Sequence, residues 1–202
     1  MKGINEMGPK LLPTKEGLII AAIEVISERG LQGLTTKEVA KRQGISESTI
    51  FKHYKTKSEL LLAVLDHFSQ FDQAIIESME DKKHHPIEAI IYFVDSYVTY
   101  YANYPQITAI IHTYEGFLRE PQLSKRIKDI FNNRINTMRL LIEEAKAHRE
   151  FKADLDSEQL AGIIIGLERL ISLKWRINNY NFSLRDQTLS ALKMQLDLLS
   201  KE

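Results

Sequence analysis

The chain has 202 residues, of which 44% are hydrophobic, so it can bury a sizeable core in one or two domains. It contains no cysteine, which excludes a disulfide framework and thiolate chemistry, and it has no apolar run long enough to span a bilayer. The 27 basic residues balance the 27 acidic residues, and a net charge of zero argues against a general nucleic-acid binder.

The N-terminal part of the chain predicts a helix that begins near Thr14, after Pro13, and ends at Gly30. Its apolar residues recur at spacings of three and four: Leu18, Ile19, Ala22, Ile23 and Ile26. The same spacing continues along the chain without the alternation of a strand, so we expect an all-α protein. The first 15 residues lack the apolar stretch of a signal peptide, so we expect the protein to be cytoplasmic.

Two very short helices are predicted between residues 35 and 54. Thr35 and Glu38 have the spacing of a capping box at the start of the first helix, and Gly44 is placed to end it. Ser46 can cap the second helix. A further capping box follows at once, so three helix starts fall within about twenty residues.

The segment from 36 to 57 is the basic part of the chain, with six basic and two acidic residues and a net charge of +4. Helices this short persist only when each packs an apolar face on its neighbours, and Val39, Ala40, Ile45 and Ile50 can supply that face. The combination predicts a helix-turn-helix, whose second helix enters the major groove of DNA. The alternative is an ordinary helical hairpin in a core.

The stretch GLTTKEVAKRQGISESTIFKHYKTKSELLLAVL, which follows the helix ending near Gly30, resembles the TetR family of transcriptional regulators. The resemblance implies a three-helix DNA-binding domain over residues 1–65 and a larger helical domain over 66–202 that dimerises and encloses a ligand pocket. The aromatic and basic pattern that ends the recognition helix in that family appears here as Phe51, His53, Tyr54 and Lys57. Phe51 departs from the tyrosine of many members, so a hydroxyl contact to phosphate would be missing.

Eleven residues are candidates for contact with DNA. Those at the start of the first short helix can meet phosphate, those in the first turn of the second face base edges, and the rest flank the groove. In chain order they are Thr36, Lys37, Ser46, Glu47, Ser48, Thr49, Phe51, Lys52, His53, Tyr54 and Lys57. Glu47 could instead provide favourable charge at a helix N-terminus, and Tyr54 could be a core residue.

The helix expected over 58–79 would connect the two domains without a flexible tether. The next predicted helix, over 86–104, is apolar on most sides but carries several tyrosines. A buried phenol needs a hydrogen-bond partner, so Tyr97, Tyr100 and Tyr101 with His112 are candidates to bind a small, mainly apolar effector with one polar group. Tyr114, Arg134 and Arg139 are further candidates. The alternative is a filled core.

We expect no metal, no cofactor and no catalysis. His84 and His85 are adjacent, so their side chains diverge, and no third ligand stands at a useful spacing. The sequence has no glycine-rich phosphate loop, and its scattered serines, histidines and aspartates do not define a catalytic triad.

The C-terminal segment contains a helix that opens with Asp156 and Gln159 at capping-box spacing and carries Gly162 and Gly166 four residues apart. Glycine inside a helix costs about 1 kcal/mol relative to alanine, so close packing should justify the pair. The resemblance implies that this helix and the last one, over 183–200 and with an apolar face that includes Leu192 and Leu196, form a four-helix dimer interface. The alternative is packing within the chain.

The sequence therefore favours a homodimeric, ligand-responsive transcriptional regulator of double-stranded DNA, a repressor released from a palindromic operator, with no membrane association. An architectural DNA-binding protein without an effector is the alternative. A helical enzyme or adaptor that does not bind DNA is the third reading.

Overall fold

This computed structural model describes residues 15–82 and 85–199, and the described residues form helices and turns without a β-strand. The all-α prediction is confirmed. Pro13, Thr14 and the N-terminal residues read as lacking a signal peptide lie outside the described residues, as does His84. None of the described helices is long and apolar enough to cross a membrane.

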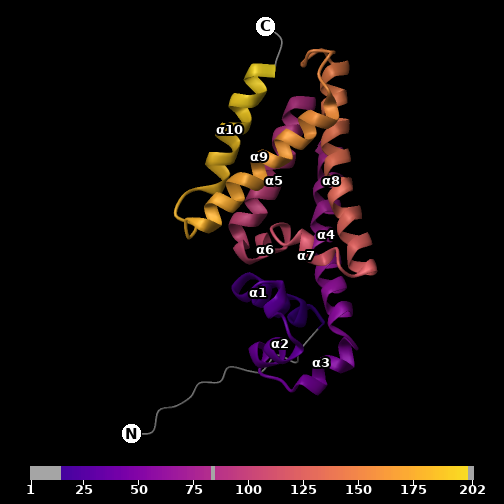
Figure 1. Cartoon of the computed structure of the whole chain (residues 1–202). Coiled ribbons are helices and arrows are strands. Elements are labelled where there is room, and N and C mark those ends of the chain that lie inside the picture. The colour runs from indigo at the N-terminus through magenta and orange to yellow at the C-terminus, as the bar shows by residue number, and fades with distance from the viewer. Residues whose placement is uncertain (1–14, 83–84, 200–202) are drawn as a thin grey trace.

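One end of the molecule consists of three helices, drawn in indigo and purple at the bottom of Figure 1. They are α1 (Lys15–Arg29), α2 (Thr36–Gln43) and α3 (Glu47–His53), and a single 3-10 turn, η1 (Leu31–Gly33), follows α1. Each helix agrees with the sequence prediction to within about a turn. The short α2 packs against α1 and α3 packs against α2, and the apolar residues of both helices join the hydrophobic core, which stabilises helices of this length.

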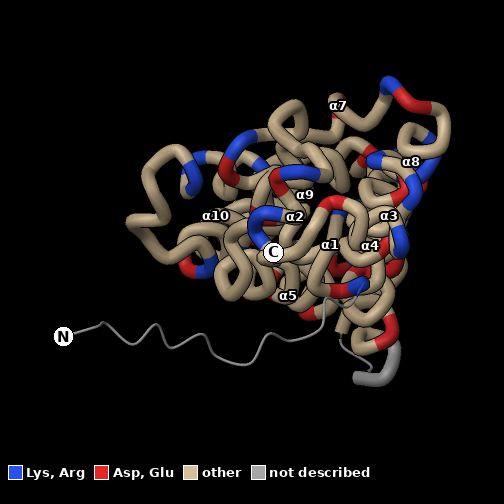
Figure 2. The backbone as a smooth tube through the Cα atoms, turned by 90° about the horizontal axis from the view of Figure 1, so that it is seen from below, with Lys and Arg blue, Asp and Glu red and all other residues tan. Residues whose placement is uncertain are grey.

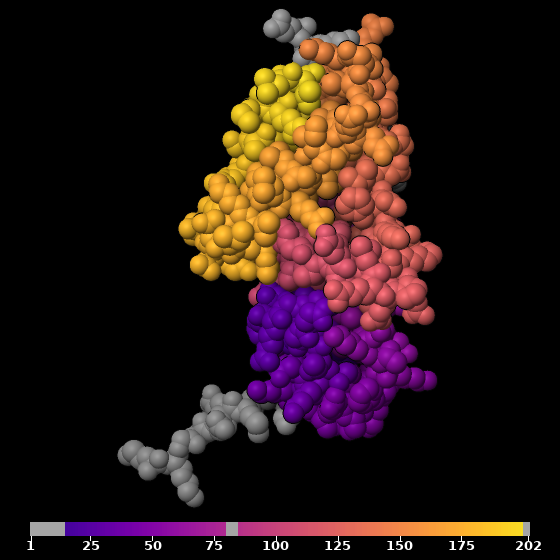
Figure 3. Space-filling model, viewed as in Figure 1, coloured from indigo at the N-terminus to yellow at the C-terminus, as the bar shows by residue number. Residues whose placement is uncertain are grey.

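The rest of the chain is a bundle of longer helices. These are α4 (Lys57–Lys82), α5 (Pro86–Asn103), α8 (Pro121–Ala147), α9 (Ser157–Ile177) and α10 (Leu184–Leu199). Between α5 and α8 the chain forms the short elements η2 (Pro105–Ile107), α6 (Thr108–Ile111) and α7 (Tyr114–Phe117). Helix α4 runs upward from the lower end into the bundle, while α9 and α10 lie on the outer side, as Figures 1 and 3 show.

The predicted helix caps form in part. Thr35 Oγ1 accepts a hydrogen bond from Glu38 N at 3.1 Å, and Asp156 accepts from the backbone of Glu158 and Gln159 at 3.0 Å. Ser46 precedes α3 but makes no side-chain cap, because its hydroxyl bonds to neighbouring side chains instead. Local spacing thus places the helix starts even where the cap itself is absent.

The two parts of the molecule are joined by α4 and by contacts beside it. Helix α1 packs against both α4 and α6. Gly116 in α7 lies directly against η1, and a Cβ atom there would come within 2.5 Å of Leu31 Cδ2. Arg126 Nε in α8 donates to Asp66 Oδ1 in α4 at 2.7 Å. The upper bundle and the lower helices are therefore joined by packed atoms rather than by a loose tether.

Candidate nucleic-acid interface and ligand groove

The turn between α2 and α3 sets the angle between the two short helices. Gly44 is in the left-handed region at φ 64°, where a side chain would be strained, and Ile45 N donates to Ala40 O at 3.0 Å to close the turn. Val39 and Ile50 are fully buried beneath the turn. This is the packed wedge that a helix-turn-helix requires.

The outer face of α3 presents most of its predicted base-contacting residues to solvent. Ser46, Ser48 and Lys52 are exposed, Thr49 is partly buried, and the ring of Phe51 is 47% exposed although it is a large apolar group. Ser46 Oγ bonds Ser48 Oγ at 2.8 Å and Thr49 Oγ1 at 2.9 Å. This face combines hydroxyls, an ammonium and an apolar ring, the groups that read base edges and thymine methyls.

Thr36 and Glu47 are brought together by the fold. The Thr36 hydroxyl donates to the Glu47 carboxylate, which ties the first turn of α2 to the first turn of α3. Sequence spacing gave no sign of this bond because the residues lie in different helices. It favours a positioning role for Glu47, in addition to its charge at the N-terminus of α3.

Tyr54 lies in the core, which was the alternative left open for it. Only 7% of its surface is exposed, its hydroxyl donates to Lys15 O at 3.4 Å, and burial raises the pKa of the phenol. The neighbouring His53 is partly buried. Tyr54 is therefore placed to hold α3 against α1 rather than to face DNA.

The positive charge of the lower end resides mainly in lysines. Arg42 does not contribute freely, since it donates to Glu24 at 3.0 Å and also pairs with Glu28, which raises the pKa of its guanidinium. The lysines of α2, of α3 and of the turn after α3 are exposed, namely Lys37, Lys41, Lys52 and Lys55. Lys57, at the start of α4, is partly buried. Figure 2 views the molecule from this end, with Lys and Arg in blue along α2 and beside α3.

Two of the predicted effector-binding tyrosines belong to a buried polar cluster instead of a cavity. Tyr97, only 2% exposed, donates to Asp72 Oδ1 at 2.9 Å, and Arg134 binds Asp72 through Nε and Nη2 and donates to the Tyr101 hydroxyl at 2.9 Å. The guanidinium also lies 4.3 Å from the centre of the Tyr97 ring. The prediction that Tyr97 and Tyr101 line a ligand pocket is not supported, because protein groups already satisfy both hydroxyls.

Tyr100 lines a surface groove of about 480 Å³ between α4 and α5. Its ring stacks on Phe71 with the centroids 3.8 Å apart, and Ser78 and Tyr92 share a hydrogen bond of 2.7 Å further along. The walls are mainly apolar with a few polar groups, as in small-molecule sites. The lining residues are Phe71, Ala74, Ile75, Ser78, Tyr92, Asp95, Ser96, Thr99, Tyr100 and Asn103.

His112 lies apart from that groove, so the four predicted effector residues do not surround one cavity. Its Nε2 atom is 3.4 Å from Ser172 Oγ, and burial with the nearby Arg176 and Arg169 lowers its pKa to about 4. A small pocket lies between α6, α7, α8 and α9. There the hydroxyl of Tyr114 and Oε1 of Glu168 are buried without hydrogen-bond partners among the described residues. Burial raises the pKa of Glu168 to about 7.

The outer surface of α9 and α10 carries most of the large apolar side chains that the described part of the chain exposes: Ile163, Leu170, Leu173, Ile177, Met194 and Leu198. Gly162 and Gly166 lie on the same face of α9, and a Cβ at either would meet no atom within 4 Å. Leu192 and Leu196 were predicted to lie in a dimer interface, and that prediction is wrong. They are 1% and 3% exposed because they pack into the chain's own core.

Two further potential metal ligands do lie near His85, contrary to the argument from spacing. His148 and Glu150, more than sixty positions away in sequence, lie beside it at the upper end of the bundle. Sequence spacing could not reveal this group, because its members come from two separate helix junctions.

Comparison with known proteins agrees with this arrangement. Residues 18–64 match the family described as bacterial regulatory proteins of the tetR family, and residues 66–197 match the family described as the C-terminal region of YsiA-like proteins. The chain belongs to the TetR family. This TetR-family protein is thus a DNA-binding transcriptional regulator, as its sequence predicted.

Individual relatives are distant. The nucleoid occlusion factor SlmA of Haemophilus ducreyi is 25% identical over 81% of this chain and 78% of its own length. The structure of FadR from Bacillus subtilis in complex with stearoyl-CoA is 23% identical, covers 91% of this chain and 98% of its own, and has a TM-score of 0.74. The ketosteroid regulator KstR2 of Mycobacterium tuberculosis is 17% identical with coverages of 96% and 98% and a TM-score of 0.80. These two structures show the shared fold.

Proposed function

We propose that this TetR-family protein is a cytoplasmic repressor that binds a palindromic operator as a homodimer and leaves it when a small, mainly apolar molecule occupies the C-terminal domain. The observation that carries the proposal is α4, which runs unbroken from Lys57 at the DNA-binding end to the groove beside Tyr100. We place the domain boundary near residue 65, with residues 1–65 binding DNA and 66–202 binding ligand and partner. The protein would act by binding, not by catalysis.

The exposed face of α3 is proposed to recognise the base sequence of the operator. Ser46, Ser48, Thr49 and Phe51 would meet base edges, while Lys37, Lys52 and Lys57 would meet phosphates and His53 would lie at the margin. Thr36 and Glu47 would hold α2 and α3 in register through their mutual hydrogen bond. Tyr54 would support α3 from the core.

Lys37→Ala and Lys57→Ala should each weaken binding to every duplex by a similar factor, because an ammonium on a phosphate carries no base information. Each should reduce the slope of log affinity against log salt by about one unit. Ser48→Ala should instead change which bases are preferred. The measurement is fluorescence anisotropy on operator and scrambled duplexes at several salt concentrations. A lysine variant with an altered base preference and the original salt slope would show that the assignment is wrong.

The groove between α4 and α5 is the proposed effector site. It is within the size range of small-molecule pockets, and four of its lining residues, including Phe71 and Ala74, belong to α4. A ligand seated there would press on α4 directly. Relatives of the same fold were solved with stearoyl-CoA or named for ketosteroids, which supports an effector with a large apolar part.

Displacement of α4 would change the distance between the two recognition helices of a dimer, which must match about one helical turn of DNA or a multiple. The ligand can lower operator affinity only by the ratio of its affinities for the two conformations. A hundredfold release therefore needs about 2.7 kcal/mol of preference, which is an ordinary allosteric coupling energy.

Ala74→Phe tests the groove, since a ring at this position would fill it without touching the DNA-binding helices. We expect the variant to bind operator normally but to lose its response to any ligand found by a thermal-shift screen of fatty acids, acyl-CoA thioesters and sterols. Ala147→Phe, at an exposed position outside the groove, is the matched control and should respond like the unmodified protein. A hit that still releases Ala74→Phe from operator would exclude this groove as the site.

The exposed apolar face of α9 and α10 is the proposed dimer interface. Gly162 and Gly166 would allow the partner's helix to approach closely, and Ile163, Leu170 and Met194 would be buried by it. Nothing within the described part of one chain covers these groups. Leu192 and Leu196 would hold α10 against the chain's own core, on the side opposite the proposed interface.

The similarity to a nucleoid occlusion factor favours a second candidate function, that of an architectural DNA-binding protein without an effector. The same screen separates the two. If no compound changes operator affinity, and the protein occupies many chromosomal sites of the same sequence, the second function is favoured.

A further inference from the structure

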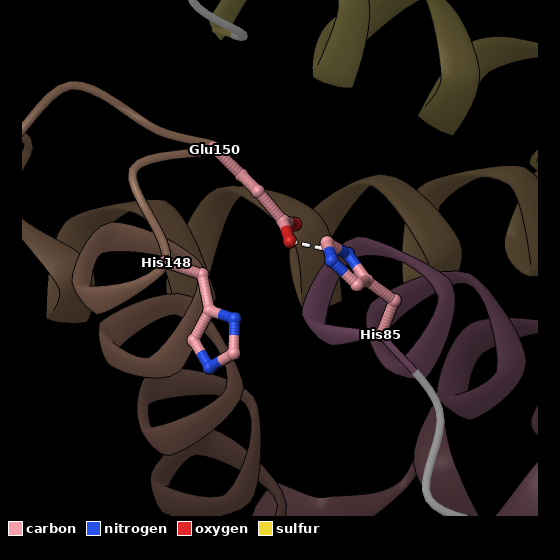
Figure 4. A group of neighbouring side chains, drawn as sticks. All are labelled: His85, His148 and Glu150. Carbon is pink, nitrogen blue, oxygen red and sulfur yellow. Dashed lines mark ion pairs between the residues drawn. The ribbon is translucent and has the colours of Figure 1, made fainter.

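The group His85, His148 and Glu150 lies at the upper end of the bundle, away from the DNA-binding helices and from the groove. His85 is the residue before α5, while His148 and Glu150 belong to the turn between α8 and α9. Figure 4 shows the Glu150 carboxylate and the His85 ring facing each other, with the His148 ring beside them. One ligand atom of each residue lies within 4.8 Å of those of the other two.

The turn that carries two of these residues is rigidly built. Glu150 N donates to Ala145 O at 2.9 Å and Arg149 N to Lys146 O at 3.0 Å, which is the bond pattern of a Schellman motif. Arg149 occupies the left-handed position at φ 64°, where glycine is usual. Phe151, which is fully buried, anchors the chain immediately afterwards. His148 and Glu150 are therefore held near each other by backbone geometry.

Contacts at both of its oxygens hold the Glu150 carboxylate in place. Oε2 accepts from Ile87 N in the first turn of α5 at 3.0 Å. Oε1 is buried and forms an ion pair with Nδ1 of His85, drawn as a dashed line in Figure 4, although the contact does not have the geometry of a hydrogen bond. A carboxylate oxygen and an imidazole nitrogen in contact share either a proton carried by the nitrogen or a metal ion, because two lone pairs that face each other repel.

We propose that His85, His148 and Glu150 bind a divalent transition-metal ion of the Zn²⁺ class. Two imidazole nitrogens and one carboxylate oxygen form the donor set of three-ligand zinc sites, with the fourth position left to water or another ligand. The nitrogen donors select against Mg²⁺ and Ca²⁺, which require oxygen ligands. A zinc ion with bonds of about 2.0–2.2 Å would separate Nδ1 of His85 from Oε1 of Glu150, which now touch, and would draw His148 inward. The imidazoles of His85 and His148 are exposed, which leaves them room to turn.

A bound ion would clamp the start of α5 to the end of α8. These helices already pack along their length, and α8 also packs against α4 and α9. The ion would thus stabilise the upper bundle, and its binding to the folded chain alone would raise the unfolding temperature as its concentration rises.

The test uses full-length protein without a polyhistidine tag, stripped of metal and titrated with Zn²⁺ in competition with a chromophoric chelator. We expect one Zn²⁺ per chain, and affinity weakened about tenfold or more in His148→Ala and Glu150→Gln, since each removes one of three ligands. His67→Ala, a partly buried histidine on α4 outside the cluster, should bind like the unmodified protein. Zn²⁺ should raise the unfolding midpoint of the unmodified protein and not that of His148→Ala.

His148→Ala decides between the metal and a simple proton-mediated pair, because the contact between His85 and Glu150 does not involve His148. The side chain of His148 is exposed, so its removal should leave the fold intact, which circular dichroism checks. Co²⁺ provides a second readout, as a four-coordinate ion absorbs strongly in the visible range. Equal Zn²⁺ affinity in the unmodified protein and His148→Ala, or the lack of stoichiometric binding, would overturn the proposal.

Discussion

Gly162→Leu should separate the dimer and weaken operator binding by about a hundredfold or more, because one subunit then loses the local concentration supplied by its partner. In the single chain a side chain at this position would meet no atom within 4 Å, so the substitution should not disturb the subunit's own fold. Removing a glycine from a helix interior should even stabilise α9 by about 1 kcal/mol. Only a second chain packed closely on this face would exclude the new side chain.

Sedimentation equilibrium and operator titration measure the two effects. Asn132→Leu, at an exposed position on α8, adds a similar apolar side chain outside the proposed interface and should leave both properties unchanged. A Gly162→Leu protein that remains a dimer with full operator affinity would place the interface elsewhere.

Arg134→Met should destabilise the folded protein by about 3–5 kcal/mol, because it leaves the Asp72 carboxylate buried without its cation. The substitution keeps much of the side-chain volume, so a cavity contributes little. Tyr101 would also lose the hydrogen bond that it accepts from Arg134. The cluster joins α4, α5 and α8, so the loss falls on the centre of the C-terminal bundle.

Urea denaturation at one fixed protein concentration measures this effect, since dimer formation makes stability depend on concentration. Arg139→Met on the same helix is the matched control, because Arg139 is partly exposed and donates to the nearby Asn136. Its change should stay within about 0.5 kcal/mol. Asp72→Leu combined with Arg134→Met should recover much of the loss, as replacement of a whole buried pair by apolar groups is often neutral. Equal stability of the two single variants would mean that the pair carries no such energy.

The DNA-binding end could be predicted almost completely from the sequence. Its determinants are local: the cap at Thr35, the left-handed turn at Gly44 and the apolar spacing of α2 and α3 all act within a few residues. The ranges of α1 and α4 were likewise predicted to within a turn, although α4 extends three residues beyond its predicted end. The bond between Thr36 and Glu47 was not predictable, since it depends on the angle at which two helices meet.

The C-terminal domain shows the limit of the same reasoning. Tyrosine spacing on α5 correctly indicated buried phenols, but it could not tell whether their hydroxyls bind a ligand or protein groups. Asp72 and Arg134, which satisfy Tyr97 and Tyr101, come from helices before and after α5. The apolar stripe of α10 was visible too, yet it did not show that Leu192 and Leu196 face the chain's own core while Met194 and Leu198 remain outside.

The sequence by itself determined the helical class and the helix-turn-helix with its basic surface, because each follows from periodicity, capping and charge within short segments. The TetR family was recognised from the resemblance of one N-terminal stretch, and the family matches over residues 18–64 and 66–197 agree. Tertiary structure alone decided which polar groups pair in the core, where the groove lies, and which face of α9 and α10 is left for a partner. It also brought Glu150 to His85, which lies 65 positions earlier in the chain. Such neighbours are set by the packing angles of long helices, and these depend on the sum of many weak contacts that no short segment encodes.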